Sequence, residues 1–232
     1  MGCDIHLTVE KRVDGKWERV DNLPPRPCSW CEGRGHYEGR PQDACYSCVT
    51  DPDSGKPTPG VQSGPYDDRN YTVFAVLANV RNDGHVTPID RARGLPADAA
   101  RRGGEDGDWD YGDHSFSWLN LRELLAYDWK QTIGDDGWVS EPTFRAWHAA
   151  GAIGHPKEWS GGVGGGRVVH ITPDEMLARV TSGAVDDGNS YYTHIKWTVR
   201  LDTYCRHFIR FMETLTAIGE PDDVRIVFGF DS

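Results

Sequence analysis

The feature that most constrains this chain is a pair of Cys-x-x-Cys motifs, Cys28–Cys31 and Cys45–Cys48, separated by thirteen residues. Each motif can fold into a tight turn that directs two sulfurs to one point. A loop of this length lets the second turn complete a tetrahedron. The spacing therefore predicts one structural zinc ion per chain, held by the four thiolates of Cys28, Cys31, Cys45 and Cys48. His36 could replace one thiolate, and two disulfides are the alternative interpretation.

A zinc ion with four thiolate ligands has no open position for a substrate. We therefore expect the metal to stabilise residues 22–66, a segment whose eight prolines keep it out of helices and sheets. The predicted organisation is one domain over residues 1–232, with residues 22–66 as a zinc-binding insertion.

The composition limits the class of protein. The 232 residues carry 36 Asp and Glu against 25 Lys and Arg, a formal net charge of −11. Such an acidic chain argues against binding to long duplex nucleic acid, which needs a basic surface. No apolar run reaches the length of a membrane span, and the polar start is not typical of a signal peptide. We expect a cytoplasmic protein with no membrane partner, and the sequence gives no oligomeric state.

Periodicity predicts an α+β fold in which a small, mostly antiparallel sheet packs with several short helices. Residues 4–20 alternate polar and apolar side chains around a turn at Asp14–Gly15, which indicates a hairpin. Residues 224–230 predict a closing strand, which we place beside the hairpin with Asp231 near Asp4 and His6. Further strands are expected at 167–171 and 191–200, and helices at 70–80, after 120, and at 142–150, 172–183 and 202–218.

Polar residues on the first strand are candidates for a catalytic site. Alternation places Asp4, His6 and Glu10 on one face, where His6 could act as a general base with Glu10. The alternative is that this face is simply exposed to solvent.

A second candidate group is His114, Ser115 and Ser117. It directly precedes the helix-capping pattern Asn120–Glu123, so we expect it at a helix N-terminus, where free N–H groups favour anions. The alternative is that these side chains only cap the helix.

The long irregular segment 81–117 is predicted to bind an anion, because loops of this length are often functional. It carries five arginines and no lysine between residues 81 and 102: Arg81, Arg91, Arg93, Arg101 and Arg102. The planar guanidinium fork suits phosphate and carboxylate. Salt bridges to nearby acidic residues are the alternative interpretation.

Several stretches resemble a widespread group of bacteriophage and prophage proteins that begin Met-Gly-Cys-Asp-Ile-His. They are Gly2–His6, Val9–Arg12, Phe74–Arg81, Arg93–Pro96, His114–Trp118 and Phe228–Asp231. The resemblance implies a viral or prophage origin and a place in the cytoplasm of the infected or lysogenic host cell. It implies no particular activity.

The first cysteine pair carries a separate resemblance. Residues Cys28–Gly35 are similar to one Cys-x-x-Cys-x-Gly-x-Gly unit of the DnaJ chaperone zinc domain. The pair Cys45–Cys48 lacks the Gly-x-Gly tail, and the chain has no His-Pro-Asp motif of a J-domain. The resemblance therefore implies zinc binding and no chaperone function.

The first functional hypothesis is a phage accessory protein that binds a small anionic ligand and sequesters a host signalling nucleotide. Arg81, Arg91 and Arg93 would hold the anion, together with Ser115 and Ser117.

The second hypothesis is a metal-dependent phosphoesterase that acts on a nucleotide. Asp4-x-His6 and Gly112-Asp-His114 resemble motifs of the calcineurin-like phosphoesterases, although the other metal-binding motifs of that family are missing. The third is an adaptor that docks a host protein on the zinc loop, with contacts from Trp30, His36, Tyr37 and Tyr46.

Overall fold

The structure is a computed structural model that describes residues 2–45, 48, 58–83, 86–100, 112–183 and 187–231. The chain divides into two compact units: unit 1 is Met1–Trp129 with Tyr204–Ser232, and unit 2 is Lys130–Thr203. Nothing in the sequence pattern predicts this division. Within the described ranges, no helix combines the length and the apolar character that crossing a membrane requires.

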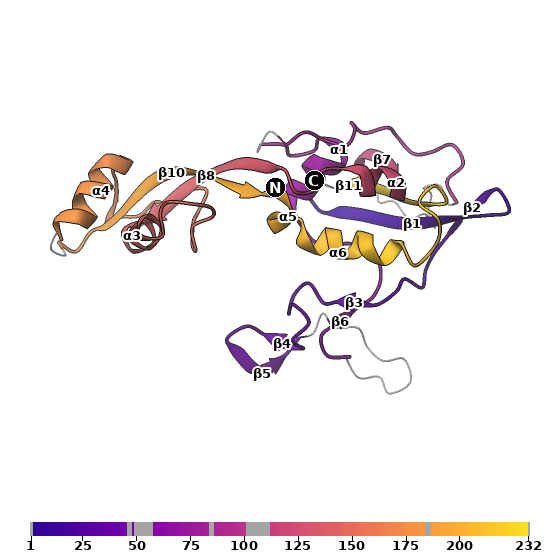
Figure 1. Cartoon of the computed structure of the whole chain (residues 1–232), viewed down its shortest axis with the longest axis horizontal. Helices are drawn as coiled ribbons and strands as arrows, with labels where there is room; N and C mark the ends of the chain where they lie inside the picture. The colour runs from indigo at the N-terminus through magenta and orange to yellow at the C-terminus, as the bar shows by residue number, and fades with distance from the viewer. Residues whose placement is uncertain are drawn as a thin grey trace. The chain divides into compact units, whose positions relative to one another are not determined.

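A four-stranded antiparallel sheet in the order β2-β1-β11-β7 is the framework of unit 1 (Figure 1). Its strands are β1 (Ile5–Val13), β2 (Lys16–Arg19), β7 (His114–Asn120) and β11 (Val224–Phe230). β1 and β2 form the predicted hairpin, whose turn residues Asp14 and Gly15 have positive φ angles of 49° and 79°. β11 lies beside β1, and the Asp4 amide donates to Asp231 Oδ1 at 2.6 Å. The α+β class and the place of the closing strand are confirmed.

The core of unit 1 lies between one face of this sheet and three helices, α1 (Tyr71–Ala78), α2 (Leu121–Ala126) and α6 (Arg206–Leu215). The ring of Phe74 in α1 packs on Phe230 of β11 at 4.9 Å between centroids. Every residue of β11 is buried, since this inner strand is covered on both faces. The predicted helices at 70–80 and after Asn120 are confirmed, each with an asparagine N-cap.

The single helix predicted over residues 202–218 is wrong. The structure has a short helix α5 (Leu201–Tyr204), a break at Cys205, and then α6. The carbonyl of Tyr204 accepts a 2.7 Å hydrogen bond from Nδ2 of Asn70, the N-cap of α1. The break falls at Cys205, whose φ of −97° and ψ of 10° depart from helical geometry, and α6 begins at Arg206.

The opposite face of the sheet carries alternating arginine and tryptophan side chains, which we call the Arg–Trp ladder: Arg12, Trp17, Arg225, Trp118 and Arg93. The guanidinium carbon of Arg225 lies 4.0 Å from the centroid of Trp17 and 5.7 Å from that of Trp118. Arg12 lies 4.6 Å from Trp17, and Arg93 lies 5.0 Å from Trp118. All four distances fall within the range of cation–π attraction.

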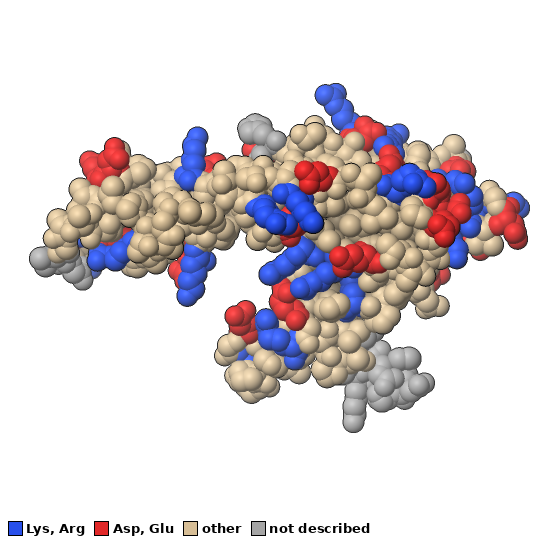
Figure 2. Space-filling view, viewed as in Figure 1, with Lys and Arg blue, Asp and Glu red and all other residues tan. Residues whose placement is uncertain are grey.

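The Arg–Trp ladder binds residues 90–100 to the sheet. Arg225 donates to Asp98 Oδ1 at 2.9 Å, and the amide of Ala100 donates to Glu10 at 2.8 Å. On the face that Figure 2 shows, acidic and basic side chains of unit 1 are interspersed, in keeping with such pairing. On the polar face of β1, Glu10 is therefore buried, whereas His6 and Thr8 are partly buried and Arg12 is exposed.

The insertion forms two small antiparallel pairs, which lie on the same side of the sheet as α6 in Figure 1. One pair is β3 (Arg26–Pro27) with β6 (Val61–Gln62), and the other is β4 (His36–Tyr37) with β5 (Arg40–Ala44). The buried guanidinium of Arg26 donates to the carbonyls of Gly64 and Pro65 and lies 5.1 Å from the ring centroid of Phe211 in α6. Arg26 therefore links the insertion to the core.

Unit 2 is a three-stranded sheet in the order β8-β10-β9, with two capped helices. Its elements are β8 (Thr132–Ser140), α3 (Glu141–Ala149), β9 (Val168–His170), α4 (Pro173–Ser182) and β10 (Ser190–Arg200). α4 has the predicted capping box between Thr172 and Glu175 and ends at Gly183, whose φ is 67°. β8 has no counterpart among the predicted strands.

Candidate metal centre and adjoining cavity

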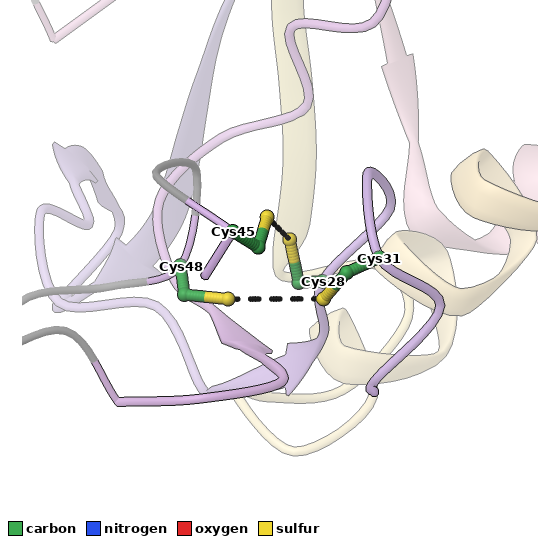
Figure 3. A group of neighbouring side chains, drawn as sticks. All are labelled: Cys28, Cys31, Cys45 and Cys48. Atoms are coloured by element: carbon green, nitrogen blue, oxygen red, sulfur yellow. Dashed lines mark hydrogen bonds between the residues drawn. The ribbon is translucent and has the colours of Figure 1, made fainter. Parts of the chain in front are cut away.

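Four buried cysteine sulfurs lie together at the ends of the short strands of the insertion (Figure 3). The Sγ atoms of Cys28 and Cys45 are 3.8 Å apart, and those of Cys31 and Cys48 are 3.7 Å apart. All four lie within 4.8 Å of one another, so the cluster could hold a metal ion. These distances exceed the roughly 2.05 Å of a disulfide bond, and the two-disulfide alternative is therefore not formed.

Glycines shape the loops around the sulfurs. The amide of Gly35 donates to Cys31 Sγ at 3.3 Å, and that of Gly60 donates to Cys48 Sγ at 3.2 Å. A Cβ on Gly60 would lie 2.2 Å from the carbonyl oxygen of Gly33, so only glycine fits there. Burial raises the pKa of Cys28 to about 12. A bound cation would offset this effect, because the thiolate is the form that binds metal.

Histidine does not contribute to the cluster. His36 directs Nδ1 to the carbonyl of Tyr37 at 3.1 Å. Among the described residues, no second group of three or more His, Cys, Asp or Glu is close enough to hold a metal. The described residues therefore contain no two-metal site built from Asp4, His6 and His114.

The metal-binding loop is fixed to α6 through Glu32. Its carboxylate accepts hydrogen bonds from His207 Nε2 at 2.8 Å and Arg210 Nη1 at 3.2 Å, and it lies 2.9 Å from Arg206 Nη2. The other ring nitrogen of His207 lies 3.3 Å from Asp68. The hydrogen bond to Asp68 raises the pKa of His207, and the hydrogen bond to Glu32 raises it further. His207 thus connects the metal loop to the segment that follows it.

A cavity of about 650 Å³ lies between the metal loop and the rest of unit 1. Trp30, one of the two residues between Cys28 and Cys31, forms part of its wall, and 57% of this residue's surface is exposed. The metal loop therefore supplies the aromatic wall of the cavity. The polar wall is formed by Asp4, Asp67, Asp68, Arg69 and His207.

The predicted site residue Asp4 lies at this cavity and is paired with Arg69. Nε and Nη2 of Arg69 donate to its two carboxylate oxygens at 2.6 and 2.5 Å. This double hydrogen bond lowers the pKa of Asp4.

The predicted site residue His6 has a different partner. Its Nδ1 lies 2.9 Å from Oδ1 of Asp113, whose side chain is 0% exposed, while the imidazole is 34% exposed. A buried carboxylate of this kind fixes the orientation of the imidazole. The structure therefore joins His6 to Asp113, and not to Glu10 as the sequence suggested.

Two other predicted site residues lie at the Arg–Trp ladder. Arg93 is a member of the ladder, and Glu10 is the counter-ion of its member Arg225. Glu10 is buried and accepts from Arg225 Nε at 2.7 Å. Arg93 donates to Asp90 at 2.7 Å and to Glu123 through two nitrogens at 3.1 and 2.6 Å. For Arg93 the structure shows the salt bridges of the alternative interpretation.

The expected helix start at His114, Ser115 and Ser117 is wrong. These residues lie in strand β7, and α2 begins only at Leu121. The cause is pairing with β11, which extends strand geometry up to the cap residue. Ser117 is fully buried, and its hydroxyl accepts from the Arg93 amide at 3.2 Å. His114 Nδ1 lies 2.9 Å from Ser115 Oγ.

Of the remaining predicted arginines, two lie in the described ranges. Arg81 lies 5.7 Å from the ring centroid of Tyr71, and Arg91 is exposed. Arg101 and Arg102, together with the predicted contact residue Tyr46, lie outside the described residues.

Sequence reasoning missed Asp67, Asp68, Asp113 and His207 as site residues. The run Asp67-Asp68-Arg69 follows the insertion and resembles an ordinary polar linker. His207 adjoins Phe208 of the apolar stripe in the predicted helix 202–218, and that stripe indicates nothing about the contacts of its polar neighbours. Asp113 lies seven residues before Asn120, where the capping pattern begins, and nothing in that stretch of sequence indicates a contact with His6.

Unit 2 has a smaller cavity of about 380 Å³. Its wall includes Arg179, which donates to Glu141 at 2.6 Å and lies 3.6 Å from the ring centroid of Tyr191.

Comparisons of this chain with protein-family models, with curated proteins and with solved structures give no match.

Proposed function

We propose that this chain is a binding protein that uses one zinc ion to hold a recognition loop at the wall of a cavity. The ligands would be Cys28, Cys31, Cys45 and Cys48. A zinc–thiolate bond of about 2.3 Å in a regular tetrahedron gives sulfur–sulfur distances of about 3.8 Å. The two Sγ–Sγ distances in the structure, 3.8 and 3.7 Å, fit this value.

The metal would act on structure and not on a substrate. Four thiolates fill the coordination of zinc, so no position remains for an attacking water. What the zinc would supply is a fixed shape for a proline-rich loop that has little regular secondary structure of its own.

The single observation that carries the proposal is the position of Trp30. It stands between two metal ligands, is 57% exposed, and lines a cavity of about 650 Å³. Tryptophan is among the residues most enriched at the energetic centres of interfaces, and this volume lies in the usual range of ligand sites. The adaptor hypothesis, with a host protein as partner, therefore has more support than the small-anion hypothesis, whose Arg93 is already paired.

A comparison of two tryptophan variants tests the proposal. Zinc-loaded wild-type protein, Trp30→Ala and Trp159→Ala would each be immobilised and incubated with host-cell extract, and retained proteins quantified by mass spectrometry. Trp159 is the matched control, because it is also exposed, at 42%, and lies in unit 2. We expect at least one protein to be retained by wild type and Trp159→Ala and lost from Trp30→Ala. Equal retention by all three would contradict the proposal, provided that zinc content is unchanged.

One observation favours a second candidate function, hydrolysis by a histidine general base. His6 is partly exposed and oriented by the fully buried Asp113 at 2.9 Å, an arrangement that general bases share. This form of the hydrolase hypothesis needs no second metal.

A further inference from the structure

The cations on the wall of the cavity beside Trp30 are already paired with carboxylates. Both carboxylate oxygens of Asp4 accept hydrogen bonds from Arg69. Both ring nitrogens of His207 lie against carboxylates, Asp68 on one side and Glu32 on the other. An incoming anion would therefore find no cation that is free of an acidic partner on this wall.

One carboxylate on the wall has no such partner. Asp67 forms no salt bridge with any residue in the described ranges, and the nearby guanidinium of Arg26 donates to the carbonyls of Gly64 and Pro65. Partial burial raises the pKa of Asp67, and the negative charge of Asp68 raises it further. Both causes act against its negative charge, whereas the nearby positive charge of Arg26 favours it, as a cation bound in the cavity also would.

The aromatic wall is also without a cation. Among the described residues, seven other tryptophan or tyrosine rings of unit 1 are in cation–π contact or ring packing with neighbours, whereas none of these contacts involves Trp30. An exposed indole face attracts a guanidinium or an ammonium through its quadrupole. The cavity thus offers a carboxylate with no salt bridge and an indole ring with no cation–π contact among the described residues.

We propose that this cavity binds an arginine side chain of a partner polypeptide, with Asp67 as counter-ion and Trp30 as the stacking surface. The inference rests on the proposed function and names the group that the site recognises. Guanidinium fits better than ammonium, because its planar fork can pair with a carboxylate while its face stacks on an indole. The cavity, at about 650 Å³, is larger than one side chain needs and leaves room for neighbouring residues of the partner.

Nuclear magnetic resonance of the tryptophan indole N–H groups tests this inference on the zinc-loaded full chain. The Trp30 signal would be assigned from its loss in Trp30→Phe. The probe is N-acetyl-arginine methylamide, and the citrulline analogue is the matched probe of similar shape without charge. We expect the Trp30 signal to shift and saturate with the arginine probe, and affinity for the citrulline probe to be at least about tenfold lower.

Two carboxylate variants sharpen the test. Asp67→Asn should weaken binding of the arginine probe about fivefold or more, because it removes the counter-ion. Glu158→Gln removes an exposed carboxylate of unit 2 and should leave the affinity unchanged. Zinc content and melting temperature, measured on both variants, would show that the fold is kept.

The outcomes separate the inference from the proposed function. Equal affinity for arginine and citrulline probes, or a Trp30 response to an acidic probe only, would overturn the arginine assignment. The same holds if no probe moves the Trp30 signal while Trp30→Ala still loses its captured partner, a result that leaves the proposed function standing. If Trp30→Ala loses no partner but the arginine probe binds, the cavity recognises the group as a free ligand and the adaptor function fails.

Discussion

The carboxylate of Glu10 accepts a 2.7 Å hydrogen bond from Nε of Arg225, and both side chains are almost completely shielded from solvent. Burying two charges is costly unless their remaining hydrogen-bonding groups are satisfied. Here Arg225 also donates to the side chain and the carbonyl of Asp98, and Glu10 accepts from the Ala100 amide. The pair is therefore part of a complete network that joins three separate segments of unit 1.

Removal of the arginine should be strongly destabilising. Arg225→Met leaves Glu10 buried without its cation, and we expect the free energy of unfolding to fall by about 3–5 kcal/mol. Urea denaturation of the zinc-loaded protein measures this loss. The double variant Glu10→Gln with Arg225→Met should recover much of it, since no isolated charge remains buried.

An exposed pair is the control for this prediction. Arg122 and Asp222 form a two-point salt bridge at 2.5 Å, but their side chains are 63% and 58% exposed. Arg122→Gln should therefore cost less than about 1 kcal/mol. A loss for Arg225→Met as small as that for Arg122→Gln would show that the buried pair of Glu10 and Arg225 contributes no more to stability than an exposed salt bridge.

Elements with local signals could be predicted from the sequence. The hairpin turn at Asp14–Gly15 needs only two residues that accept positive φ, and α4 is bounded by a capping box at Thr172 and by Gly183. Such signals lie within a few residues of the element they define. They remain visible without knowledge of the rest of the fold.

β8 could not be predicted, because its middle, Gly134-Asp-Asp-Gly137, resembles a turn. In the structure this stretch pairs with β10, and Trp197 lies opposite Asp135. A Cβ on Gly137 would lie 2.7 Å from the ring of Trp159, so the glycine admits a tryptophan instead of making a turn. Partners distant in sequence decide the conformation here.

The same distinction applies to the candidate site. The four cysteines share a motif spacing, and the sequence placed them together correctly. The cavity beside them has walls from residues 4, 30, 67–69 and 207, and no periodicity relates these positions. His6 and Asp113 likewise meet only because β1 and β7 flank β11 in the sheet.

Loss of one cysteine should release the metal loop without unfolding the main sheet. Native mass spectrometry should find one zinc ion per wild-type chain and, for Cys28→Ser, an average of less than one zinc ion per chain. Limited proteolysis of that variant should cut within residues 22–66 and spare the four-stranded sheet, because Glu10 and Arg225 do not depend on the loop.

His36→Ala is the matched control for metal binding. His36 contacts the Tyr37 carbonyl and lies outside the sulfur cluster, so this variant should keep its zinc. Zinc loss from His36→Ala equal to that from Cys28→Ser would mean that the histidine is a ligand after all.

The second candidate function predicts a specific pattern of hydrolysis rates. If His6 is a general base, His6→Gln should lower the hydrolysis of bis-p-nitrophenyl phosphate by about 10²–10⁴-fold. Asp113→Asn should also slow it, because the orienting carboxylate is changed. His148→Gln, on an exposed position of α3, should have no effect. Equal rates in wild type and His6→Gln would exclude His6 as the base for this reaction.

The contact of His207 in α6 with Glu32 of the metal loop and with Asp68 should weaken as the pH rises. Asp68 and Glu32 hold the pKa of His207 above its ordinary value of about 6.5, so the fold stabilises the protonated imidazole. That contribution is fully present below about pH 6.5 and is lost as the pH rises through the folded pKa. His207→Gln should therefore be less stable than wild type by about 1–3 kcal/mol near pH 6, the usual range for hydrogen bonds to charged groups. The difference should shrink towards about pH 9 in urea denaturation of zinc-loaded protein. His148→Gln should show no such trend, and a constant difference for His207→Gln would mean that the neutral imidazole forms this contact equally well.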